Sequence, residues 1–146
     1  MAATAWSFYN SFREYIGNGQ FDLDGSVGFY LALHTSAASA NVNTKTLSTQ
    51  ASLANEVGSG NGYTTGGASV TARTWASVAT DKYRFDSTAV VWTATGGTIA
   101  NIKYAVVYQA GGKLVCFSKL TTSQFTLAED NTLTVTPSAS GIFELA

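Results

Sequence analysis

From residue 70 onward the chain alternates apolar and polar residues with a period of two, and this pattern restricts the fold more than any other feature. The alternating runs cover residues 70–78, 83–85, 89–93, 102–108, 114–118, 125–127, 133–135 and 142–145. Most gaps contain Gly, Asn or Asp, as in Gly96-Gly97 and Gly111-Gly112. Short strands joined by tight turns at this spacing are typical of an antiparallel sandwich or barrel.

Two further elements come before these strands. Residues 27–35 form a compact apolar run that predicts one more strand. Ahead of it lies an apolar stripe with helical spacing, made of Phe8, Phe12, Tyr15 and Ile16. We expect a short helix there, capped by Thr4 and ended by Gly17-Asn18-Gly19. Such a helix is suited either to the core or to docking on a neighbour.

These patterns together predict an all-β fold. We expect an antiparallel β-sandwich of jelly-roll-like type, with a short N-terminal helix and one long loop section. The expected division is a helical arm at residues 1–20 and a β-sandwich domain at residues 21–146.

The long loop section covers residues 36–67. It is rich in Ser, Ala, Asn and Thr at first and rich in Gly at residues 58–67. One or two helical turns around residues 52–56 would shorten it. A loop of this length is usually functional in a compact domain, so we expect contact with a partner here.

Charge is scarce in this chain. Only 12% of residues are charged and the net charge is −1, whereas roughly 25% is usual in a soluble domain. Residues 25–44, 57–72 and 87–102 contain no charge at all. A nearly uncharged surface opposes association only weakly, because little charge repulsion separates the molecules. This favours a protein that binds other proteins. Eight cations in total disfavour a basic face for nucleic acid, and no apolar run approaches the ~20 residues that span a membrane.

Residues with catalytic or metal-binding chemistry are isolated in the sequence. His34 lies at a strand end without an adjacent nucleophile or carboxylate, and Cys116 lies between Val115 and Phe117 in a strand. Asp22-Leu23-Asp24-Gly25 begins like a calcium loop but lacks its later ligands. The Gly-rich segment lacks the Gly-Lys-Ser/Thr ending of a phosphate loop. We therefore expect no enzyme, no catalytic residue, no cofactor and no metal.

Aromatic residues fall into two groups. Those on strands, namely Trp75, Trp92, Tyr104 and Tyr108, suit the core or a sugar-binding face. Those near the N-terminus, namely Trp6, Phe8 and Tyr9, suit anchoring at an interface.

A longer series of motifs resembles a known family over residues 20–146. The series is Asp22-Leu23-Asp24, Asn55-Glu56-Val57, Gly60-Asn61-Gly62-Tyr63-Thr64-Thr65-Gly66-Gly67, Trp75, Phe85-Asp86, Val90-Val91-Trp92-Thr93-Ala94, Gly96-Gly97, Tyr104-Ala105-Val106-Val107-Tyr108 and Gly141-Ile142-Phe143. Their order and spacing resemble the small virion proteins of tailed bacteriophages, of the capsid decoration (cement) type.

The resemblance implies a non-enzymatic structural role on the virion. A protein of this kind is made in the host cytoplasm, binds the outer capsid surface and clamps neighbouring major capsid protein subunits. We expect a homotrimer whose partners are the major capsid protein and itself, with no nucleic acid and no membrane. The expected contact residues are Trp6, Phe8, Tyr9, Asn55, Asn61, Tyr63, Thr64 and Thr65. The alternative is a tail fibre or tail-tip module that binds host glycans through aromatics such as Trp75 or Tyr63.

Overall fold

The computed structural model describes residues 6–38 and 42–146. Its strands are β1 (Ser7–Phe8), β2 (Phe29–Thr35), β3 (Ala68–Ser69), β4 (Thr74–Ala79), β5 (Lys82–Asp86), β6 (Val90–Thr93), β7 (Ile99–Gln109), β8 (Lys113–Lys119), β9 (Phe125–Leu127), β10 (Thr132–Val135) and β11 (Phe143–Leu145). The helical segments are α1 (Asn10–Gly17) and two 3-10 turns, η1 (Ser36–Ala38) and η2 (Gln50–Ser52). All strand pairs are antiparallel, so the expected all-β sandwich with a short N-terminal helix is confirmed.

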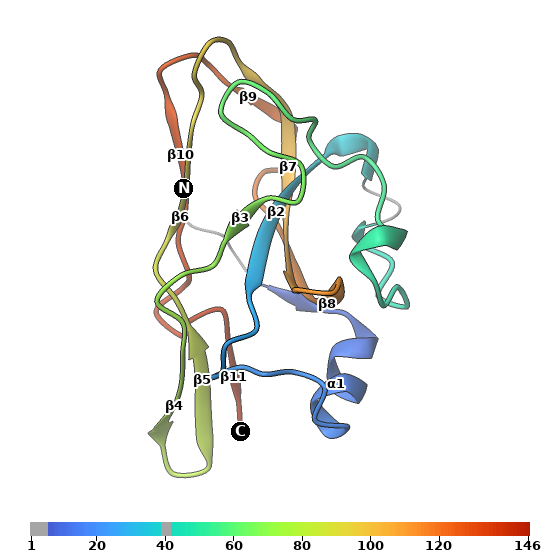
Figure 1. Cartoon of the computed structure of the whole chain (residues 1–146), viewed down its shortest axis with the longest axis vertical. Helices are drawn as coiled ribbons and strands as arrows, with labels where there is room; N and C mark the ends of the chain where they lie inside the picture. Colours follow the sequence, from blue (N-terminus) through green and yellow to red (C-terminus); the bar gives the residue numbers. More distant parts are fainter. Residues whose placement is uncertain (1–5, 39–41) are drawn as a thin grey trace.

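Two layers make the sandwich (Figure 1). The larger sheet has the order β1-β8-β7-β2-β3, with β9 also paired to β7. The second layer contains the pair β10-β6 and the three-stranded sheet β11-β5-β4. The β4–β5 hairpin extends beyond the ends of β2 and β7, at the lower end of the molecule in Figure 1.

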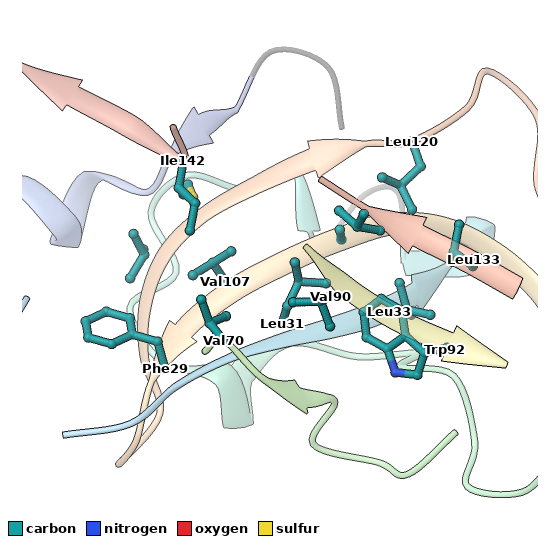
Figure 2. Close-up of a cluster of buried hydrophobic side chains, with 14 of the residues drawn as sticks. Phe29, Leu31, Leu33, Val70, Val90, Trp92, Val107, Leu120, Leu133 and Ile142 are labelled. Atoms are coloured by element: carbon teal, nitrogen blue, oxygen red, sulfur yellow. The ribbon is translucent and has the colours of Figure 1, made fainter. Parts of the chain in front are cut away.

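The main core lies between these layers. Figure 2 shows side chains of β2 and β7 facing side chains of β6 and β10. Phe29, Leu31 and Leu33 alternate along β2 toward this core, and all three are buried. Val90 and Trp92 of β6 and Leu133 of β10 meet them from the second layer. The period-two pattern therefore has its expected cause, since alternate residues of a strand point to one face.

The larger sheet is also buried on its other face. There Ala32 of β2 and Val106 of β7 belong to a second buried cluster with Val42, and Leu47 and Leu53 pack against it. Residues 42–53 thus cover the back of the sheet. The expected helix at residues 52–56 is replaced by η2 at Gln50–Ser52.

The N-terminal segment is built into this core. β1 pairs with β8, the Phe12 side chain is 1% exposed, and the Phe8 and Phe12 rings stack with centroids 4.9 Å apart. Residues 6–20 therefore pack against the β-sandwich through β1 and the apolar side of α1. The helix also begins later than expected, at Asn10, because Phe8 is in a strand. Thr4, its expected cap, lies outside the described residues.

One expected strand begins later than predicted. The alternation at residues 70–78 predicts a continuous strand, but Ala72 has a φ of 47° in the left-handed region. This turn ends the path of β3 before β4 begins at Thr74. Alternation of apolar and polar residues indicates which face of a strand each side chain occupies. It does not indicate where the backbone turns and the strand is interrupted.

Candidate contact surface

A polar network holds the Gly-rich loop against β2. The Tyr63 hydroxyl donates to Glu56 Oε1 at 2.7 Å and accepts a hydrogen bond from the Leu33 backbone N–H at 2.9 Å. The same carboxylate oxygen accepts from the Gly66 N–H at 2.6 Å. Glu56 also forms an isolated β-bridge with His34. We call the contacts of Glu56, Tyr63 and Gly66 with β2 the loop clasp.

Two glycines of the loop allow close approach of the backbone. A Cβ atom on Gly67 would lie 2.1 Å from the Leu31 carbonyl oxygen, and one on Gly62 would lie 2.1 Å from the Thr93 carbonyl oxygen. Both glycines have positive φ, 76° and 91°. Their positions are explained by packing of the loop onto β2 and β6.

Asn61 connects this loop to the turn between β6 and β7. Its side-chain Nδ2 donates to the Thr98 carbonyl oxygen at 2.8 Å, and its own carbonyl oxygen accepts from the Thr95 N–H at 3.1 Å. Parts of the two charge-free stretches at residues 57–72 and 87–102 therefore meet through Asn61 at one end of the molecule, the upper end in Figure 1.

Small polar side chains are exposed over this end. We call this surface the neutral end and define it by Ser59, Asn61, Thr64, Thr65, Thr93, Thr95 and Thr98. The exposed acidic residues Glu129 and Asp130 lie at its margin, since the Asp130 N–H donates to the Ala94 carbonyl oxygen. The neutral end offers hydroxyl, amide and backbone groups for hydrogen bonding to another protein.

The structure divides the eight expected contact residues. Asn55, Asn61, Thr64 and Thr65 are exposed, whereas Trp6 and Phe8 are partly buried and pack against the main core.

Tyr9 and Tyr63 are 0% and 2% exposed, so their expected role as surface contacts is wrong for this conformation. Each ring lies in the core and each hydroxyl has a partner, Val42 O for Tyr9 and Glu56 for Tyr63. Burial raises the pKa of both tyrosines, because it disfavours the charged phenolate.

The chemically reactive residues are buried and separate from one another. His34 is fully buried, its Nδ1 lies 3.1 Å from the Ala54 carbonyl oxygen, and burial lowers its pKa. Cys116 is also fully buried, and burial raises the pKa of its thiol. Within residues 6–38 and 42–146, no three His, Cys, Asp or Glu side chains gather closely enough to hold a metal ion. No helix in the same residues has both the length and the apolar character needed to cross a membrane.

Asp22 belongs to a local turn. A Cβ atom on Gly25 would lie 2.0 Å from the Asp22 carboxylate oxygens, so this carboxylate packs directly over the Gly25 backbone. The Asp22 N–H donates to the Gln109 side chain at 3.1 Å. These contacts agree with a turn ahead of β2.

A groove lies at the opposite end from the neutral end. It has a volume of about 260 Å³ and is lined by Ile16, Phe21, Leu23, Asp24, Trp75 and Leu145. Trp75 is half-buried there, with its ring centroid 5.4 Å from that of the exposed Tyr83. Of the four strand aromatics, Trp92, Tyr104 and Tyr108 are buried. Trp75 is thus the one of the four with an open side.

Sequence reasoning missed the role of Glu56, although a signal was present. Glu56 is the only charged residue between Lys45 and Arg73. A single carboxylate in a long uncharged stretch indicates a specific partner, here the Tyr63 hydroxyl and the Gly66 N–H. The groove beside Trp75 gives no such signal, because its lining residues are scattered from Ile16 to Leu145.

Comparison of the chain with protein-family models, with curated proteins and with solved structures finds no match.

Proposed function

We propose that this chain is a non-enzymatic structural protein of a tailed-bacteriophage virion, a decoration protein that binds the outer capsid surface and clamps neighbouring major capsid subunits. The proposal includes synthesis in the host cytoplasm and assembly as a homotrimer. Its first support is the motif series, whose order and spacing resemble those of such proteins. The observation that carries it is the neutral end, where the two charge-free stretches form one exposed surface.

Uncharged surfaces suit a protein whose identical copies are crowded together. A decoration protein occupies many equivalent places on a shell, so identical surfaces lie close together. Charged surfaces of one sign would repel at such spacing, whereas Ser, Thr and Asn side chains bind through hydrogen bonds without repulsion. The loop clasp and the Asn61 side chain support this function indirectly, because together they fix the backbone of the neutral end. A fixed surface loses less conformational entropy on binding.

The direct test is co-sedimentation with capsids of the same virus assembled without this chain. We expect wild-type protein to sediment with the capsids and saturate at a fixed number of copies. Thr64→Lys places a charge on the neutral end and should weaken binding by about tenfold or more. Thr122→Lys makes the same change at an exposed threonine outside the neutral end and should bind like the wild type. Absence of binding by wild-type protein at saturating concentration would contradict the capsid role.

The groove beside Trp75 favours the second candidate, a tail fibre or tail-tip module that binds host glycans. The exposed part of the Trp75 ring can stack on a sugar ring, and the Asp24 carboxylate in the same groove can accept hydrogen bonds from the sugar hydroxyl groups. The number of copies per particle separates the two functions. Hundreds of copies indicate the capsid, and a handful indicate the tail.

A further inference from the structure

Strand β4 has an unpaired edge that is unusually long for this molecule. It is the outermost strand of the sheet β11-β5-β4 and spans six residues. Among the described strands, the others with an unpaired edge, namely β1, β3, β6, β9, β10 and β11, span two to four residues. Short edges protect a sheet against pairing with another chain, and β4 lacks this protection.

The composition of β4 also leaves the edge open. Thr74–Ala79 contains no charged residue and no proline, and every residue except Trp75 is exposed. Val78, at a register shift between Ser77 and Ala79, is 42% exposed. Charges, especially lysine, are the usual means by which natural edge strands avoid association, and they are missing here.

An open strand edge determines what can bind it. Over Thr74–Ser77, ahead of the register shift at Val78, β4 presents backbone N–H and C=O groups in alternation, and another extended strand satisfies them in the same geometry as β5 does on the other side. The occupant is therefore a polypeptide strand.

The flanking charges favour a second copy of the same strand. Arg73 stands immediately before β4, and Asp81 stands in the exposed turn after it. The Arg73 guanidinium donates to the carbonyl oxygens of Val27 and Gly25 and lies 5.2 Å from the centroid of the Phe29 ring. Neither Arg73 nor Asp81 takes part in an ion pair within the described part of the chain. Two copies of β4 that pair antiparallel about a twofold axis bring the Arg73 end of each strand near the Asp81 end of the other. The net charge of −1 adds little repulsion between copies.

We propose that β4 is a homotypic docking edge, through which two copies of this chain pair antiparallel and join their sheets into the order β11-β5-β4-β4-β5-β11. This contact is additional to the homotrimer of the proposed function and does not depend on capsid binding. It joins copies in pairs, so on a shell it connects chains that belong to neighbouring trimers.

The test uses the full chain in solution without capsids, with mass measured by sedimentation equilibrium over a concentration series. Val78→Lys puts a positive charge on the β4 edge of both copies. Val91→Lys is the matched control, since Val91 is the other exposed valine, 53% exposed on the outer face of β6. We expect the wild type and Val91→Lys to associate equally, and Val78→Lys to have a lower mass at the same concentration, with the dissociation constant of the β4 contact raised at least about tenfold.

Circular dichroism and thermal unfolding establish that each variant is folded. If Val78→Lys does not fold, Thr74→Lys replaces it, because Thr74 is exposed and pairs with Asp86 on β5, which tolerates a lysine opposite it. A wild-type mass of one copy at every concentration would overturn the proposal. So would a wild-type mass that Val78→Lys leaves unchanged, or one that both variants lower equally. Capsid co-sedimentation measures binding to the capsid and not β4 pairing. The capsid role can therefore fail while β4 pairing holds, and β4 pairing can fail while the capsid role holds.

Discussion

Removal of one oxygen atom from Tyr63 tests whether the loop clasp holds the Gly-rich loop in place. In Tyr63→Phe the ring still fills its place in the core, but two hydrogen bonds are lost. The Leu33 N–H loses its acceptor at 2.9 Å, and Glu56 loses a donor at 2.7 Å. Leu33 is fully buried, so water does not replace the lost acceptor.

The expected loss in the free energy of unfolding follows from the hydrogen bonds that Leu33 and Glu56 lose. A buried donor without an acceptor costs about 1–3 kcal/mol, while Glu56 keeps the bonds from Gly66 and Gln50 and loses less. We expect the free energy of unfolding to fall by about 2 kcal/mol. For a domain of this size, that corresponds to a decrease in Tm of about 4–8 °C.

The assay is urea unfolding followed by intrinsic fluorescence, with Tyr83→Phe as the control. Tyr83 is 47% exposed, and its loss of a hydroxyl should change the free energy of unfolding by less than about 0.5 kcal/mol. The dependence of stability on urea concentration should be the same in all three proteins, because the fold is unchanged. If Tyr63→Phe is as stable as the control variant, the loop clasp does not stabilise the loop and the reasoning is refuted.

Three further predictions concern other parts of the chain. Gly62→Ala should be much less stable than Gly96→Ala in urea unfolding, since both glycines have positive φ but only the Gly62 Cβ would collide with a backbone oxygen; equal losses would contradict the close approach. The pKa of Glu144 lies below its ordinary value of 4.5, mainly because Arg84 donates hydrogen bonds to it. The ionised form thus stabilises the fold above that value, and this contribution is lost as the pH falls through the lowered pKa. The stability difference between wild type and Glu144→Gln should therefore shrink on acidification from about pH 5 to about pH 3, and a constant difference would argue against it. The thiol of Cys116 should react with a disulfide reagent only after unfolding, because it is fully buried with a raised pKa; rapid reaction of the native protein would be inconsistent with this burial.

The strands could be predicted from the sequence because burial of one face imposes a period of two. Phe29, Leu31 and Leu33 illustrate this along β2. The start of β4 only at Thr74 could not be predicted in this way, because the single left-handed residue Ala72 leaves the alternation intact. The start of α1 at Asn10 could not be predicted for a related reason. Phe8 fits the apolar stripe of a helix and a strand beside β8 equally well.

The candidate surface was predicted only in part. The sequence indicates that the Gly-rich loop is unusual, but composition does not distinguish an aromatic residue that anchors a partner from one that anchors the loop itself. Tyr63 is of the second kind, because its hydroxyl finds both a donor and an acceptor inside the molecule. Thr64 and Thr65 of the same loop are exposed, and the Thr65 hydroxyl accepts a hydrogen bond from the Ser59 hydroxyl. The distinction depends on the pairing of residues that are far apart in sequence, such as Leu33 with Tyr63, and local patterns do not contain it.

The scarcity of charge has different consequences at the two ends of the molecule. At the neutral end it leaves hydroxyl and amide groups on a backbone fixed by side-chain bonds, which suits repeated binding to one kind of surface. At β4 it leaves backbone groups without the lysines that normally prevent pairing, which suits binding to another strand. These surfaces lie at opposite ends of the long axis (Figure 1). One copy can therefore contact a shell through one end and a second copy through the other, and a substitution such as Val78→Lys or Thr64→Lys should affect one contact without the other.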